Sequence, residues 1–188
     1  EFASVQSLAG QFLIASPYLP DPNFLRTVVL MVQHDEEGAL GLVLTRPIQL
    51  TVEEVWKNVS GEAIDAPEAV LQGGPVEGPL MAIHQEEDLG ELEVIPGVYF
   101  SSQRENIEPL IRGARNTFRL FLGYSGWGAQ QLEDEMDVGG WLTLPAKKEQ
   151  VFETDNDVLW KSVTGEVGSN IMRDSLNIKR MPPDPNVN

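Results

Sequence analysis

The chain consists of short apolar runs separated by turn-forming residues, a pattern typical of strands joined by loops. Two of these runs, at 27–33 and 39–45, are apolar at most positions and enclose the polar segment 34–38. Because successive side chains of a strand point to opposite faces, such runs predict strands buried on both faces, here joined as a hairpin. Further strands are predicted at 12–15, 69–72, 80–84, 91–95, 98–100, 117–122 and 141–144.

Helices are predicted between these groups of strands. The segment that starts at Thr51 has a capping-box pattern, in which the Thr51 hydroxyl and the Glu54 carboxylate satisfy free N–H groups of the first helical turn. Apolar residues at helical spacing follow it, and similar spacing predicts helices near 102–112, 129–136, 154–163 and 169–176. Single helices among groups of strands, without a repeated βαβ unit, indicate an α+β fold with a mixed, largely antiparallel sheet.

The 188 residues are enough for one domain with a sizeable core. We predict that residues 1–180 form this single domain and that residues 181–188, which include three prolines, form a disordered tail. No apolar run approaches the roughly 20 residues that a membrane span needs. The absence of cysteine excludes disulfides, thiolate zinc sites and thiol catalysis. Since no signal segment is recognisable either, the sequence favours a cytoplasmic location.

The chain is strongly acidic, with 13 Lys and Arg against 29 Asp and Glu and a formal net charge of −16. The acidic residues are spread over the whole chain, which disfavours direct binding to nucleic acids and to anionic membrane surfaces. One stretch, from Pro109 to Leu132, has no acidic residue and contains Arg112, Arg115 and Arg119. These arginines could bind a small anion, or they could balance nearby acidic side chains.

The segment 123–127 (Gly-Tyr-Ser-Gly-Trp) is close to the nucleophile elbow of esterases, Gly-x-Ser-x-Gly. Trp127 stands where the elbow needs its second glycine, and both histidines, His34 and His84, precede the serine in the chain. We therefore assign no catalytic residue. Gly123, Gly126 and Gly128 could instead offer free N–H groups to an anion before a helix, or form a tight strand-to-helix connection with Trp127 packed on the sheet.

Two acidic or polar sets are candidates for ligand binding. Glu133 and Asp137 are spaced i,i+4 on one helical face, where they could hold a hard cation or form part of a solvated surface. Asp21, Asn23 and Arg26 form a polar turn before a strand, either an Asx-turn with an ion pair or one wall of a pocket. Neither histidine has a partner at zinc-binding spacing, so we predict no metal and no cofactor.

Six blocks of the sequence, read together, resemble the YqgE/AlgH family of bacterial proteins. The blocks occur in the order of that family and the similarity covers roughly residues 8–163. They are DPNFxRTV at 21–28, HDEEGALGLV at 34–43, RP at 46–47, GGPV at 73–76, GYxGWG at 123–128 with QLE at 131–133, and WL at 141–142.

The resemblance implies a compact α+β domain with a curved or barrel-like sheet and peripheral helices. One branch of the family, AlgH, is described as a transcriptional regulator of alginate synthesis, and the family brings no accepted catalytic residue or cofactor. This chain departs from the family pattern at Ser125, where alanine is common, at Ala129-Gln130, where Pro-Gly is frequent, and at Gly140, where asparagine is frequent.

Two functions remain open from the sequence. The first is a non-enzymatic binding or regulatory protein that acts through a protein partner or a small ligand. The second is an anion- or phosphate-processing hydrolase that would use the N–H groups of Gly126 and Gly128, Arg26 or Arg119, and an acid such as Asp21 or Glu133. The candidate ligand-binding residues are Asp21, Asn23, Arg26, Gly73, Gly74, Tyr124, Gly126, Trp127, Gly128 and Glu133.

Overall fold

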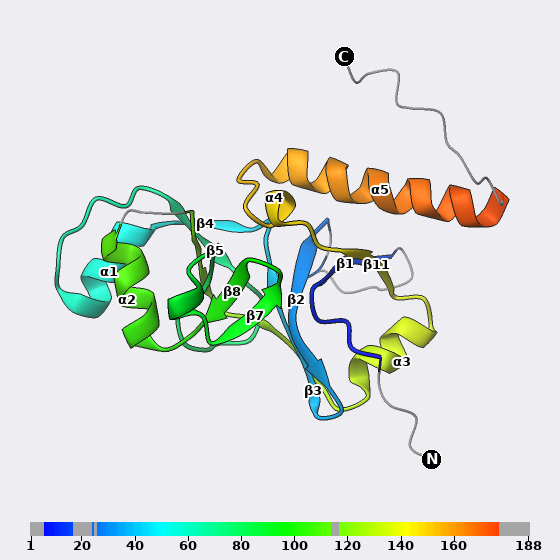
Figure 1. The fold of residues 1–188 in the computed structure, drawn as a ribbon, viewed down its shortest axis with the longest axis horizontal. Helices are drawn as coiled ribbons and strands as arrows, with labels where there is room; N and C mark the ends of the chain where they lie inside the picture. The colour runs from blue at the N-terminus through cyan, green and yellow to red at the C-terminus, as the bar shows by residue number, and fades with distance from the viewer. Residues whose placement is uncertain (1–5, 17–23, 25, 114–116, 177–188) are drawn as a thin grey trace.

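The computed structural model describes residues 6–16, 24, 26–113 and 117–176, which form two β-sheets with helices packed around them (Figure 1). Neighbouring strands of the first sheet are all antiparallel. Its order is β10 (Ser125–Gly128), β3 (Gly38–Val43), β2 (Val28–Asp35), β1 (Gln11–Ala15) and β11 (Trp141–Pro145). The predicted hairpin is β2 and β3, whose register shifts between Met31 and Gln33.

The second sheet is mixed, because β5 and β9 pair in parallel while its other neighbours are antiparallel. Its order is β4 (Pro47–Thr51), β5 (Ala69–Gln72), β9 (Arg119–Leu122), β6 (Met81–His84), β8 (Val98–Ser101) and β7 (Leu92–Ile95). The predicted α+β class with largely antiparallel pairing is confirmed. Among the described strands the two sheets are open and are not closed into a barrel.

The helices lie at the periphery, as predicted. They are α1 (Val52–Ser60), α2 (Arg104–Gly113), α3 (Gln131–Asp137), the short α4 (Lys148–Val151) and the long α5 (Asn156–Leu176), with a 3-10 turn η2 at Glu87–Leu89. The helix α1 begins at the predicted capping box: Thr51 accepts the N–H of Glu54, and the Glu54 carboxylate accepts the N–H of Thr51. Helices α1 and α2 lie at one end of the molecule, and α3 and α5 lie at the other end, beside the first sheet (Figure 1).

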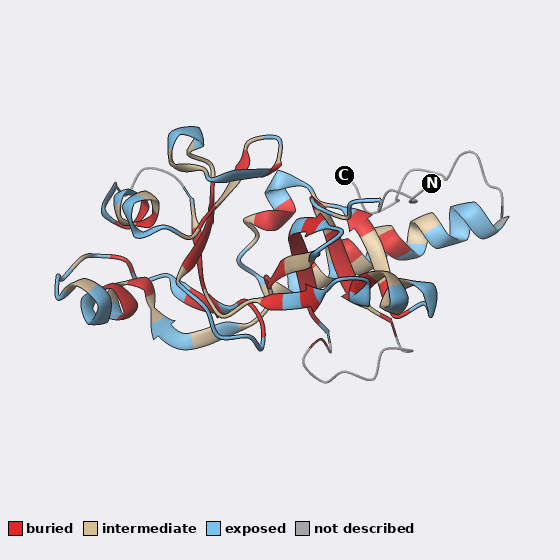
Figure 2. Ribbon diagram, turned by 90° about the horizontal axis from the view of Figure 1, so that it is seen from below, coloured by how far each residue is buried: buried red, intermediate tan, exposed pale blue. Residues whose placement is uncertain are grey.

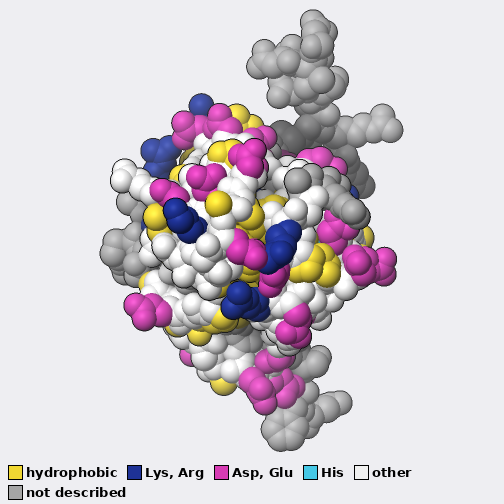
Figure 3. All heavy atoms as spheres, turned by 90° about the vertical axis from the view of Figure 1, so that its left-hand side faces the viewer, with side chains coloured by type: hydrophobic (Ala, Val, Ile, Leu, Met, Phe, Trp, Pro, Cys, Tyr) yellow, Lys and Arg dark blue, Asp and Glu magenta, His cyan; other side chains and the backbone are white. Residues whose placement is uncertain are grey.

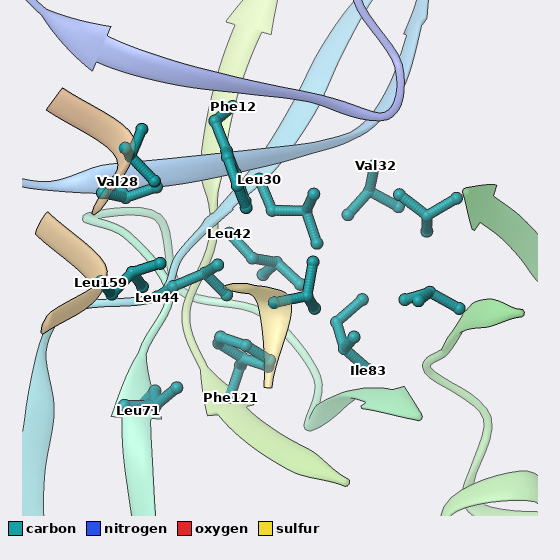
Figure 4. Packing of buried hydrophobic residues seen from close by; sticks show 14 of the residues in the cluster. Phe12, Val28, Leu30, Val32, Leu42, Leu44, Leu71, Ile83, Phe121 and Leu159 are labelled. Carbon is teal, nitrogen blue, oxygen red and sulfur yellow. The ribbon is translucent and has the colours of Figure 1, made fainter. Parts of the chain in front are cut away.

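One apolar core joins the two sheets. Phe12, Leu30 and Leu42 of the first sheet pack towards Ile83 and Phe121 of the second, and all five side chains are fully buried (Figure 4). The opposite faces of the two sheets have their own clusters, one beneath α1 and α2 that includes Trp56 and one beneath α3 that includes Trp127 and Trp141. The segments that connect the two sheets therefore lie against a densely packed core.

The long helix α5 is only half covered. Leu159, Val163 and Val167, spaced i,i+4, face the core, whereas the turns after Val167 are exposed and include Ile171 and Met172 (Figure 2). Across the parts of the chain that the structure describes, no helix combines the length and the apolar character required to cross a bilayer. The proposed tail, 181–188, lies outside the described residues.

Candidate functional site

Two glycine segments that the sequence analysis selected meet at the junction of the sheets. The carbonyl oxygen of Gly73, just after β5, accepts the N–H of Val43 at 2.8 Å and the hydroxyl of Ser125 at 3.1 Å. At Gly74, any Cβ would overlap the backbone of Tyr124, so the two segments are in direct contact. A groove of about 470 Å³ lies beside them and is lined by residues that include Ile48, Gln72, Gly74, Val76 and Gly123.

Ser125 belongs to the interior of this junction. It is fully buried, and its Oγ donates to the carbonyl of Gly73. The prediction that residues 123–128 connect a strand directly to a helix is wrong. Residues 125–128 form β10, an edge strand of the first sheet, and α3 begins only at Gln131, whose side chain accepts the N–H of Gly128. Gly123 allows the close contact with the backbone of Gly74, and the glycines of β10 do not precede a helix directly.

Tyr124 and Trp127 point to different sides of the glycine-rich segment. The half-buried Tyr124 ring lies next to Gly78 and Gly126, where a Cβ on either glycine would contact it closely. Trp127 is 5% exposed and packs with Phe24 and Trp141, with ring centroids 5.9 Å apart in each pair. Trp127 is thus a core residue of the first sheet, as one of the two interpretations predicted.

The polar turn before β2 is described only in part. Asp21 and Asn23 lie outside the described residues, and Arg26 is exposed with a left-handed φ of 53°. Phe24, between them in sequence, contacts both Trp127 and Trp141. This contact brings one residue of the turn to the first sheet, on the same side as the Trp127 ring.

The two described arginines of the acid-free stretch, Arg112 and Arg119, both have hydrogen-bonding partners within the protein. Arg119 is buried, and its guanidinium donates to the carbonyls of Leu44, Val151 and Glu153 at 3.2–3.3 Å. Burial lowers the pKa of Arg119 to about 10, and the nearby Glu153 opposes this shift, so the side chain remains charged at neutral pH. Arg112 pairs with Glu62 and Glu108, as expected for an arginine that balances acids, and Arg115 lies outside the described residues.

His34 and Glu133 form a second site. Of the two, only Glu133 was predicted from the sequence as a candidate ligand-binding residue. His34 Nδ1 accepts the N–H of Leu8 at 3.0 Å, and His34 Nε2 lies 2.7 Å from Glu133 Oε1. The His34 side chain is 2% exposed and that of Glu133 is 22% exposed. A cavity of about 270 Å³ opens beside the pair and is lined by Gln6, Leu8, His34, Glu133, Met136 and Asp137.

His84, the other histidine, is fully buried in the second sheet. Its Nε2 lies 2.8 Å from Ser101 Oγ, which donates to the carbonyl of Leu89, and its Nδ1 accepts the N–H of Glu86. Burial lowers the pKa of His84, although Glu86, Glu91 and Asp88 oppose this shift. The imidazole is therefore held neutral, as an acceptor at Nδ1 and a donor at Nε2, in a structural role.

The candidate residues occupy separate places and do not line a single cleft within the described part of the chain. Gly73, Gly74 and Tyr124 are at the sheet junction, Trp127 is in the aromatic cluster, and Glu133 is in the cavity with His34. Glu133 and Asp137 both line that cavity, but the described residues contain no group of three or more acidic or histidine side chains arranged to hold a metal ion.

Comparison with known proteins agrees with the resemblance seen in the sequence. The AlgH-like family profile matches residues 12–172. A UPF0301 protein of Chlorobaculum tepidum is 40% identical over 167 residues, which cover 85% of this chain and 87% of that protein. A UPF0301 protein of Xanthomonas euvesicatoria is 38% identical over 174 residues, which cover 88% of this chain and 92% of that protein.

Two solved structures share the fold. The solution structure of the AlgH protein from Pseudomonas aeruginosa has a TM-score of 0.75 and 28% identity, and the match covers 96% of this chain and all of that one. A Corynebacterium diphtheriae protein, at 22% identity, matches in fold with a TM-score of 0.63 over 96% of this chain and 91% of its own. With a family match over most of its length, relatives at about 40% identity and the architecture of AlgH, the chain belongs to the YqgE/AlgH family.

Proposed function

We propose that this protein is a non-enzymatic binding or regulatory protein of the cytoplasm, which acts through a protein partner or a small ligand. The observation that carries the proposal is the engagement of the groups that catalysis would need. Ser125 is buried against Gly73, Arg119 donates to three backbone carbonyls, and His84 is buried with both ring nitrogens bonded. All three side chains are buried, and each would have to give up a present hydrogen bond or become exposed before it could act on a substrate.

Charge supports a function without direct DNA contact. The net charge of −16 opposes binding to a polyanion, because affinity for nucleic acid comes largely from Lys and Arg that displace counterions from phosphates. On the face formed by the α1 and α2 end, basic side chains stand apart among acidic ones and do not gather into a positive groove (Figure 3). Any effect on transcription, as proposed for AlgH-type regulators, would then be indirect and would pass through a partner.

The hydrolase alternative lacks a shared site among the described residues. The N–H of Gly128 is bonded to Gln131, Arg119 is buried, and Glu133 accepts from His34 at the cavity. These groups would have to leave their present partners before they could act together on a phosphate. The binding function requires no such rearrangement.

A ligand screen combined with two exclusion assays tests the proposal. Thermal unfolding of the purified chain against metabolites and nucleotides is expected to show at least one compound that raises the Tm, since a ligand that binds only the folded state stabilises it. Gel shifts with random and promoter DNA at about 150 mM salt are expected to show no complex at micromolar protein, given the salt sensitivity of phosphate contacts.

Hydrolysis of p-nitrophenyl phosphate is expected to match a heat-denatured blank. A different result would favour the hydrolase over the binding function. In that case the wild type would hydrolyse the substrate, the Glu133→Gln variant would not, and the Asp134→Asn variant, changed on the same helix, still would. Tight binding to a specific DNA sequence at that salt concentration would also overturn the proposal.

A further inference from the structure

We infer that the cavity beside His34 and Glu133 binds a small organic cation, specifically a primary alkylammonium ion. The inference rests on the proposed function, for which it names the class of ligand. The cavity lies between the N-terminal residues Gln6 and Leu8, the end of β2 and the helix α3, and is distinct from the groove at the glycine junction.

Hydrogen bonds fix the protonation of the buried imidazole. Because the N–H of Leu8 points at Nδ1 of His34, this nitrogen must accept, and the single ring proton is on Nε2, which donates to Glu133 Oε1. The neutral imidazole therefore orients the Glu133 carboxylate without cancelling its charge. The buried histidine acts here as a positioning residue for an anionic group that is still 22% exposed at the cavity.

Among the residues that the structure describes, the lining carries two negative charges and no positive one. Glu133 and Asp137, one helical turn apart on α3, both border the cavity, and its described lining contains neither lysine nor arginine. A cation in the cavity would meet two carboxylates in a partly enclosed space, where charge interactions are stronger than in open water. An anion would be repelled by the same groups.

The size and the remaining walls favour an ammonium ion on a short alkyl chain. A cavity of about 270 Å³ holds the volume of roughly nine water molecules, at about 30 Å³ each in the liquid. Leu8 and Met136 supply apolar surface for methylene groups, and Met side chains adapt readily to such groups. The three N–H bonds of a primary ammonium ion can be shared between Glu133 and Asp137, which a quaternary ammonium ion cannot reproduce.

Titration with n-butylammonium chloride, followed by calorimetry and by ¹⁵N-detected amide shifts, tests the inference. We expect saturable binding with a shift of the Leu8 amide, which reports directly on the His34 pair. Sodium butyrate and n-butanol, which have the same chain without the positive charge, are expected to bind at least about tenfold more weakly. Tetramethylammonium chloride is expected to bind more weakly than n-butylammonium, because it has no N–H donors.

Variants of α3 localise the site. Glu133→Gln keeps an oxygen that can accept from His34 but removes the charge. Glu133→Gln and Asp137→Asn, as single variants, are each expected to lower the association constant for n-butylammonium about tenfold or more, equivalent to about 1.4 kcal/mol. Asp134→Asn changes the same charge on an exposed position of α3 that does not line the cavity, and is expected to change binding less than twofold.

Absence of saturable binding to the wild type, or equal losses in Glu133→Gln, Asp137→Asn and Asp134→Asn, would overturn the inference and leave the His34–Glu133 pair as a purely structural contact. If n-butylammonium fails but another compound raises the Tm in the ligand screen, only this inference fails and the proposed function stands. Phosphate turnover that depends on Glu133 would overturn the proposed function instead.

Discussion

The indole N–H of Trp141 donates a 2.7 Å hydrogen bond to the carboxylate of Glu135, and the same oxygen accepts the indole N–H of Trp127 at 3.0 Å. Glu135 is on α3, Trp127 is on β10 and Trp141 is on β11, so one carboxylate connects the helix to both edge strands of the first sheet. Gln131 donates to its other oxygen. This contact satisfies two indole groups that would otherwise be left without acceptors under α3.

Replacing Glu135 with leucine is expected to lower the free energy of unfolding by about 1–3 kcal/mol, because two largely buried indole N–H groups lose their acceptor. Urea unfolding followed by circular dichroism measures the loss. Asp134→Leu, at an exposed neighbouring position, is the matched control and is expected to cost less than about 0.5 kcal/mol. Equal costs for the two variants would show that the carboxylate does not stabilise the aromatic cluster.

Arg119 is expected to be important for stability rather than for ligand binding. Arg119→Met would leave the carbonyls of Leu44, Val151 and Glu153 without their shared donor, at a cost of about 2–4 kcal/mol in urea unfolding. Arg112→Met, at a half-exposed ion pair, should cost less than about 1 kcal/mol. The prediction is contradicted if Arg119→Met unfolds at the same urea concentration as Arg112→Met.

Much of this fold could be predicted from local patterns in the sequence. The β2–β3 hairpin and the Thr51 cap of α1 were predicted because their signals lie within a few residues. Strand β4 was missed, since Pro47 and mostly exposed residues give it no apolar run. Strand β10 was missed because its glycines offer only Trp127 as a buried apolar side chain, so that its pairing with β3 depends on tertiary packing.

The candidate site was harder to predict than the fold. Glu133 was selected for its i,i+4 spacing with Asp137, and both line the cavity. Its partner His34 is 99 positions away in sequence, and the two meet only because α3 packs against the first sheet. No local spacing encodes such a pair, and an isolated histidine at the end of an apolar strand carries no signal of its own.

The burial of His84 makes stability depend on pH. The pKa of His84 is lowered in the folded state, whereas in the unfolded chain it has the ordinary value of 6.5. Below pH 6.5 the unfolded chain therefore binds a proton at His84 more readily than the folded chain does. The contribution of His84 to stability is therefore complete above about pH 6.5 and declines as the pH falls towards the lowered value. Urea unfolding of the wild type and of His84→Gln at pH 7.5 and 5.5 measures this difference.

The wild type is expected to lose more stability than His84→Gln between these two pH values. The rest of the sequence is the same in both proteins, so the comparison reports on the imidazole. A parallel loss in both proteins would contradict the neutral, buried state of His84.

β1 lies between β2, its neighbour in sequence, and β11, the last strand in the described part of the chain. β1 pairs with β2 on one side and, through register partners such as Phe12 and Leu144, with β11 on the other. During synthesis, β1 therefore has one unpaired edge until residue 145 has emerged from the ribosome. Pairing between such distant segments is slow, and an open edge can recruit other nascent chains. We therefore expect the yield of folded protein to rise when that edge is protected, by a chaperone or by slow expression at low temperature, until β11 has been synthesised.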